Sequence, residues 1–98
     1  MFPTVVALAI TVGSSAFALN LDGQKYLPEA KLSLTEARQI AVKEYPGKFV
    51  SQELEKEPGG SGLRYSFVIS NKGAKHEVGV DAKTGAVLEN SIEGKNPD

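Results

Sequence analysis

The sequence predicts an α+β domain in which one N-terminal helix packs on a three- to four-stranded antiparallel sheet. A single segment with helical periodicity, residues 32–45, comes first, and segments with strand alternation follow it, separated by turn sequences. Strands that follow one another through short turns pair antiparallel, and one face of such a sheet needs a cover. The predicted order is therefore one helix followed by four strands, with the helix on one face of the sheet.

The predicted helix has recognisable start and stop signals. Ser33 and Glu36 have the spacing of a capping box, in which each side chain bonds the backbone N–H of the other residue. Pro46 has no N–H with which to continue a helix, and Gly47 can take a left-handed exit. The apolar stripe predicted to face the sheet consists of Leu34, Ala37, Ile40, Ala41 and Tyr45. The predicted solvent side consists of Glu36, Arg38, Gln39 and Lys43.

Four segments with alternating polarity are predicted as strands: residues 48–57, 63–70, 74–81 and 86–89. In the first strand, Val50 and Leu54 are expected to share the inward face. Tyr65 and Phe67 are expected in the core of the second. The turn before the last strand begins with Asp81, which can bond backbone N–H groups two residues on, and ends with Gly85, which tolerates a positive φ. Residues 58–62, Pro-Gly-Gly-Ser-Gly, lack the Lys-Ser/Thr ending of a phosphate loop and are predicted as a flexible hairpin loop.

The N-terminus has the layout of a secretory signal peptide. An apolar run from Val5 to Val12 leads to an Ala-x-Ala site, so cleavage is expected after Ala18, although no Lys or Arg precedes the run. The predicted organisation is a signal peptide (1–18), a leader or linker (19–31), the domain (32–92) and a disordered tail (93–98). The mature protein is therefore expected in the periplasm or outside the cell, with no membrane span after cleavage.

Composition excludes several kinds of function. The chain of 98 residues has no cysteine, so neither disulfides nor thiol chemistry are available, and a net charge of −1 disfavours nucleic acid as a partner. His76 is the single histidine, and strand alternation turns Glu77 and Asp81 away from it, which argues against a mixed metal site. No serine has a Gly-x-Ser-x-Gly context. We therefore predict no catalytic, cofactor-binding or metal-binding residue and no enzymatic activity.

The order of motifs resembles that of a PepSY domain. The resemblance is carried by residues 34–41, by Tyr45-Pro46-Gly47, by residues 63–69 and by residues 80–88, and it covers nearly all of residues 32–88. It implies a helix on an antiparallel sheet. The family occurs in propeptides of thermolysin-type metalloproteases, in envelope proteins and as small exported proteins, and its proposed role is to inhibit or restrain peptidases. No protease domain follows Asp98, so we expect action in trans rather than as a propeptide in cis.

These observations favour a non-catalytic protein-binding module that restrains an exported peptidase or holds another extended chain. The candidate surface is the outer sheet face, with an exposed sheet edge as a second way to bind a partner strand. The residues of this candidate surface are Arg64, Ser66, Val68, Lys75, Glu77 and Gly79. The alternative is a small-ligand or cation sensor acting through Glu53, Glu55 and Glu57, although a solvated charged face is the simpler interpretation of that row. The sequence does not predict the oligomeric state.

Overall fold

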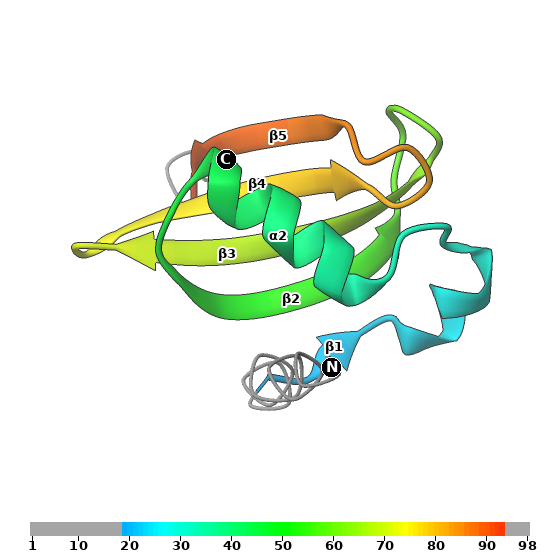
Figure 1. The fold of residues 1–98 in the computed structure, drawn as a ribbon, viewed down its shortest axis with the longest axis horizontal. Helices are drawn as coiled ribbons and strands as arrows, with labels where there is room; N and C mark the ends of the chain where they lie inside the picture. Colours follow the sequence, from blue (N-terminus) through cyan, green and yellow to red (C-terminus); the bar gives the residue numbers. More distant parts are fainter. Residues whose placement is uncertain (1–18, 94–98) are drawn as a thin grey trace, which may run out of the picture.

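The helix covers one face of a single sheet in the computed structural model, which describes residues 19–93 (Figure 1). The predicted signal peptide (1–18) and all but the first residue of the predicted tail (93–98) lie outside the described residues. A short strand β1 (Leu21–Asp22) and a 3-10 helix η2 (Gln24–Glu29) precede helix α2 (Leu34–Glu44). Four strands follow: β2 (Lys48–Lys56), β3 (Leu63–Asn71), β4 (Ala74–Asp81) and β5 (Val87–Ile92).

The sheet has the order β1-β2-β3-β4-β5 and is antiparallel except for β1, which runs parallel to β2. The predicted α+β class, with the helix before the strands, is confirmed. The sheet has one strand more than predicted, because Leu21 pairs with Gln52 and lies in the core at 9% exposure. Two residues are too few to show an alternation of polarity, so no strand was predicted there. The last strand also extends to Ile92, beyond its predicted end at Glu89.

Helix α2 begins with the predicted capping box. The Glu36 N–H donates to Ser33 Oγ at 3.1 Å, and the Ser33 N–H donates to Glu36 Oε1 at 2.8 Å. Gly47 leaves the helix with a positive φ, as predicted, but its value of +158° is far from that of a left-handed helical turn. Residues with a side chain rarely adopt this φ, and a Cβ at this position would also overlap the carbonyl oxygen of Ser70 on β3.

The core lies between α2 and the sheet, and the predicted aromatic residues are part of it. Tyr65 and Phe67 are fully buried, and the Tyr65 hydroxyl donates to the Leu32 carbonyl at 2.9 Å. Burial raises the pKa of the Tyr65 hydroxyl, with a smaller contribution from the charge of Glu36. Ala37 and Ala41 are also fully buried, and their small side chains let α2 lie close to the strands.

Two predictions about which side chains face the core and which face solvent are wrong. The register of β2 against β3 shifts between Phe49 and Ser51, so Val50 falls in a bulge and is 40% exposed instead of sharing the inward face of Leu54. Arg38 is not on the solvent side of the helix. Its Nη1 donates to the Oε1 of buried Gln52 at 2.7 Å, and its guanidinium lies 4.0 Å above the Phe49 ring.

Candidate functional site

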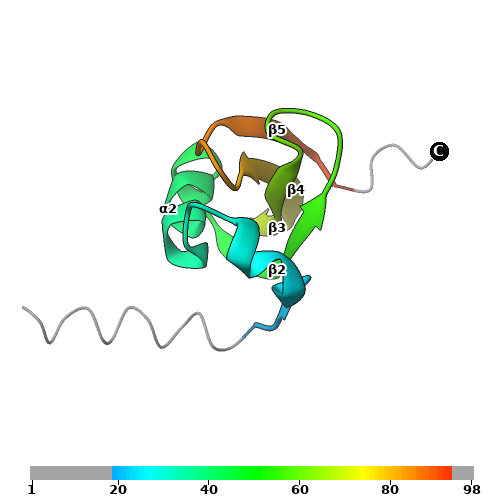
Figure 2. The same cartoon turned by 90° about the vertical axis from the view of Figure 1, so that its right-hand side faces the viewer.

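The six residues of the predicted partner surface lie on the sheet face opposite α2, which no other described helix covers (Figure 2). Their accessibility differs widely. Arg64 is 8% exposed, Ser66 is 6% exposed and Gly79 is buried, whereas Val68 and Glu77 are half-buried and Lys75 is exposed. A partner can therefore reach only part of the surface that the sequence predicted.

Arg64 is buried by contacts across the sheet. Its Nη1 donates to Glu89 Oε1 on β5 at 3.4 Å, and its Nη2 donates to the Pro58 carbonyl at 3.1 Å. The guanidinium lies across Gly79, where a Cβ would be 3.2 Å from Nη1. The Arg64 Nε has no hydrogen-bond acceptor among the described residues. Arg64 and Gly79 thus hold the strands β3, β4 and β5 together on this face.

Several glutamates from different strands lie on the rest of this face. Ser66 Oγ donates to Glu55 Oε2 at 2.8 Å. Partial burial raises the pKa of Glu77, and the negative charges of the surrounding glutamates raise it further; these are Glu89, Glu55, Glu57 and Glu93. A hydrogen bond with Glu55 and its charge likewise raise the pKa of Glu57. The sequence predicts the β2 glutamates only as a separate row, because the glutamates that join them from β4 and β5 are distant in the chain. Within residues 19–93, no three carboxylate or imidazole groups are placed to hold a metal ion.

Asp81 connects the two loops at one end of the sheet. It accepts hydrogen bonds from the Ser61 N–H at 2.7 Å, the Ser61 hydroxyl at 2.8 Å, the Lys83 N–H at 2.8 Å and the Thr84 N–H at 3.1 Å. Burial alone would raise the pKa of Asp81, but these bonds outweigh it and lower the pKa to about 2. The predicted Asp81 turn is therefore present, with Gly85 at φ +85°. The bonds to Ser61, which tie the glycine-rich loop to this turn, were not predicted.

His76 is half-buried, with contacts to one face of its ring and to one ring nitrogen. Its ring stacks on Tyr45 with centroids 3.8 Å apart, and its Nδ1 lies 2.7 Å from Asn90 Oδ1. The Asn90 Nδ2 donates to Glu44 Oε2 on α2 at 3.4 Å. These contacts place Asn90 on the helix side of β5.

Strand β5 is an outer edge of the sheet, and no described strand lies beyond it (Figure 1). At its end the Glu93 N–H donates inward to the Lys75 carbonyl at 2.8 Å. Because alternate residues of an antiparallel strand direct their backbone groups to opposite sides, Asn90 and Ile92 direct theirs away from β4. These N–H and C=O groups are available to a further strand.

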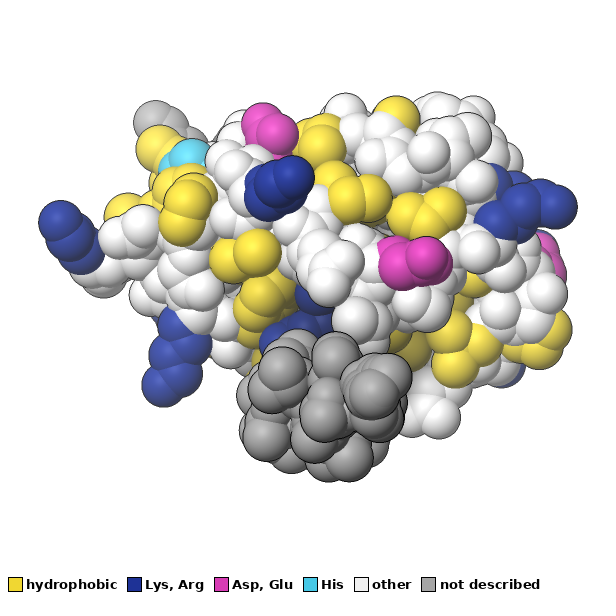
Figure 3. All heavy atoms as spheres, viewed as in Figure 1, with side chains coloured by type: hydrophobic (Ala, Val, Ile, Leu, Met, Phe, Trp, Pro, Cys, Tyr) yellow, Lys and Arg dark blue, Asp and Glu magenta, His cyan; other side chains and the backbone are white. Residues whose placement is uncertain are grey.

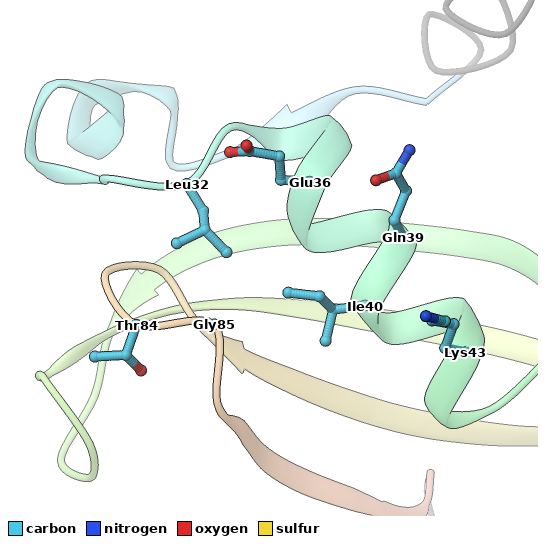
Figure 4. A pocket seen from close by; sticks show the side chains of 7 residues that line it. All are labelled: Leu32, Glu36, Gln39, Ile40, Lys43, Thr84 and Gly85. Carbon is cyan, nitrogen blue, oxygen red and sulfur yellow. The ribbon is translucent and has the colours of Figure 1, made fainter.

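A shallow groove of about 460 Å³ lies next to this edge, between α2 and the β4–β5 turn (Figure 4). Leu32 and Ile40 provide its apolar part, and Glu36 and Lys43 are its charged groups. The remaining lining residues are Gln39 from α2 and Thr84 and Gly85 from the turn.

Two of the four exposed large hydrophobic residues in the described chain lie on β5, Val87 at 38% and Ile92 at 55%. Figure 3 shows hydrophobic side chains at the surface over β5 and the neighbouring turn. The sequence predicts a free edge but not the groove, because the walls of the groove come from segments 41 to 53 residues apart, Leu32 to Lys43 and Thr84 to Gly85.

The structure thus defines a helix-covered antiparallel sheet with a free edge and an adjacent groove. Residues 31–90 match the PepSY family model, described as "Peptidase propeptide and YPEB domain". The match spans more than half of the chain, and the protein belongs to the PepSY family. Comparisons with curated proteins and with solved structures found no match. In the part of the chain that the structure describes, none of the helices has the length and hydropathy of a membrane-spanning segment.

Proposed function

We propose that this protein is a non-catalytic, exported binding module that restrains a peptidase in trans by pairing with an extended segment of it. Membership of a family described by its peptidase propeptides supports a peptidase as the partner. The observation that carries the binding mode is the free edge of β5, where Asn90 and Ile92 offer backbone groups beside exposed Val87.

Strand addition explains how such an edge would bind. A partner segment that lies along β5 gains main-chain hydrogen bonds, and its alternate side chains supply specificity. On the helix side those side chains would meet Val87, Ile92 and the groove beside α2, where apolar contacts contribute roughly 25 cal/mol for each Å² of surface buried.

The test is a binding and inhibition assay of the protein against a panel of exported peptidases from its own source. Two variants block the edge: Ile92→Pro removes an outward N–H, and Val87→Lys places a charge where a partner strand would pack. Val50→Lys is the matched control, because Val50 has nearly the same exposure, 40% against 38%, but lies on β2, with β3 and β4 between it and β5.

We expect at least one peptidase to be bound and inhibited by the native protein and by Val50→Lys. Both β5 variants are expected to weaken this inhibition about tenfold or more, and circular dichroism should show that they remain folded. Inhibition that persists in folded β5 variants would refute the edge as the binding position. If no peptidase in the panel is bound at micromolar concentration, the proposed function is wrong.

A further inference from the structure

The two sides of β5 differ in chemistry. On the helix side, Val87 lies opposite buried Val80, and Ile92 lies opposite His76. On the open side, Glu89 and Ser91 lie together, with Ser91 Oγ donating to Glu89 Oε2 at 2.9 Å. Glu93 continues this open side, since its N–H extends the pairing with β4 to Lys75 and it follows Ser91 by the two-residue spacing of a strand. A strand paired with β5 therefore meets an apolar side and an acidic side.

The acidic side carries more negative charge than its own cations balance. On the open face of the described chain, the one salt bridge joins Arg64 to Glu89 at 3.4 Å. Lys75 bonds Glu93 through the backbone, and its side chain makes no ion pair with a described residue. Glu93 at the edge and Glu77, one strand further in on β4, are thus acidic groups that no cationic side chain of a described residue pairs.

We propose, on the basis of the strand addition suggested above, that the segment received by β5 alternates apolar residues with Lys or Arg. Side chains directly opposite each other on paired strands interact, so opposite charges stabilise the pair and like charges destabilise it. Basic residues of the partner would lie opposite Glu89 and Glu93, with Glu77 one strand further in on the same face, and its apolar residues would face Val87, Ile92 and the groove. Successive side chains of a strand point to opposite faces of the sheet. A strand with basic side chains on one face and apolar side chains on the other therefore has the two kinds alternating in its sequence.

The test uses synthetic nonapeptides labelled with fluorescein, with binding measured by fluorescence anisotropy at low salt. The first peptide alternates Lys and Val, the second has the same composition with all Lys in one half, and the third alternates Glu and Val. Two charge-matched double variants of the protein are compared. Glu77→Gln/Glu93→Gln removes two charges beside β5, and Asp22→Asn/Glu53→Gln removes two exposed charges at the opposite edge of the sheet.

We expect the alternating Lys–Val peptide to bind at least about fivefold more tightly than either other peptide. Glu77→Gln/Glu93→Gln should weaken it about threefold or more, and Asp22→Asn/Glu53→Gln should leave it unchanged. Rising salt should reduce this difference, since salt screens exposed charges. Equal binding of the alternating and grouped Lys–Val peptides would overturn the inference, and so would equal losses in the two double variants, because either result indicates general charge attraction.

The inference and the proposed function can fail separately. If the protein binds the alternating Lys–Val peptide selectively but inhibits no peptidase, the inference holds and the peptidase is the wrong partner. If a peptidase is inhibited through β5 but the two double variants inhibit it equally well, the proposed function holds and the alternating pattern is refuted.

Discussion

At the scale of single residues, Asp81 connects two loops, because its buried carboxylate accepts hydrogen bonds from both. The donors are Ser61 in the glycine-rich loop and Lys83 and Thr84 in the β4–β5 turn. We expect Asp81→Asn to lower the free energy of unfolding at neutral pH by about 2 kcal/mol, since hydrogen bonds to a charged group are strong and an amide cannot accept all of them. Urea denaturation followed by circular dichroism measures this change. Asp22→Asn, an exposed aspartate on β1, is the control and should have little effect.

The same substitution should alter the response to acid. The pKa of Asp81 falls from an ordinary value of 3.8 to about 2 on folding, so its contribution is fully present above 3.8 and is lost as the pH falls toward 2. The native protein should therefore lose stability over this interval, and Asp81→Asn should show a smaller loss. Parallel curves for the two proteins would contradict the role assigned to this carboxylate.

At the scale of secondary-structure elements, the capping box at the start of α2 makes a testable contribution. Ser33→Ala should lower the free energy of unfolding by about 1 kcal/mol, because the Glu36 N–H loses its acceptor. Ser33→Asp keeps an acceptor and should retain most of the stability. In a double-mutant cycle with Glu36→Ala, the two losses should not add, since each residue bonds the backbone of the other. Additive losses would show that the two bonds are independent.

The elements also show which features a sequence can reveal. The capping box and the Asp81 turn are formed by residues three or four apart, so their geometry follows from local spacing alone. The parallel strand β1 and the bulge at Val50 depend on pairing with distant strands. Arg38 turns toward the sheet because Gln52 and Phe49 offer it an acceptor and a ring, and nothing near Arg38 in the sequence indicates them. The groove beside β5 and the acidic open face were missed for the same reason.

At the scale of the whole molecule, stability at different pH values reflects two opposing groups of carboxylates. Asp81 binds its proton less readily in the folded state, so its stabilising contribution is lost in strong acid. Glu77 and Glu57 have raised pKa values and bind protons more readily when folded. Their effect on the pH dependence of stability is therefore opposite to that of Asp81. The free energy of unfolding falls as the pH rises through and above 4.5, the ordinary pKa of glutamate. Maximum stability is therefore expected in mildly acidic solution.

Glu77→Gln tests this account, because it removes the half-buried member of the acidic face without changing its shape. The variant should gain about 0.5 kcal/mol in free energy of unfolding at neutral pH, since like charges across strands destabilise a sheet, and should gain little in mild acid, where Glu77 is already protonated in part. Urea denaturation at a series of pH values measures both effects. Asp22→Asn, an exposed position on β1 at the other edge of the sheet, is the control. The basic segment proposed as the partner would offset the negative charges of this face, as protonation of Glu77 does. If the free energy of unfolding did not change with protonation of Glu77, the negative charges on this face would not repel one another enough for a basic segment to stabilise it. A native free energy of unfolding that does not vary with pH would therefore argue against the destabilising effect of Glu77 and against the proposed basic partner.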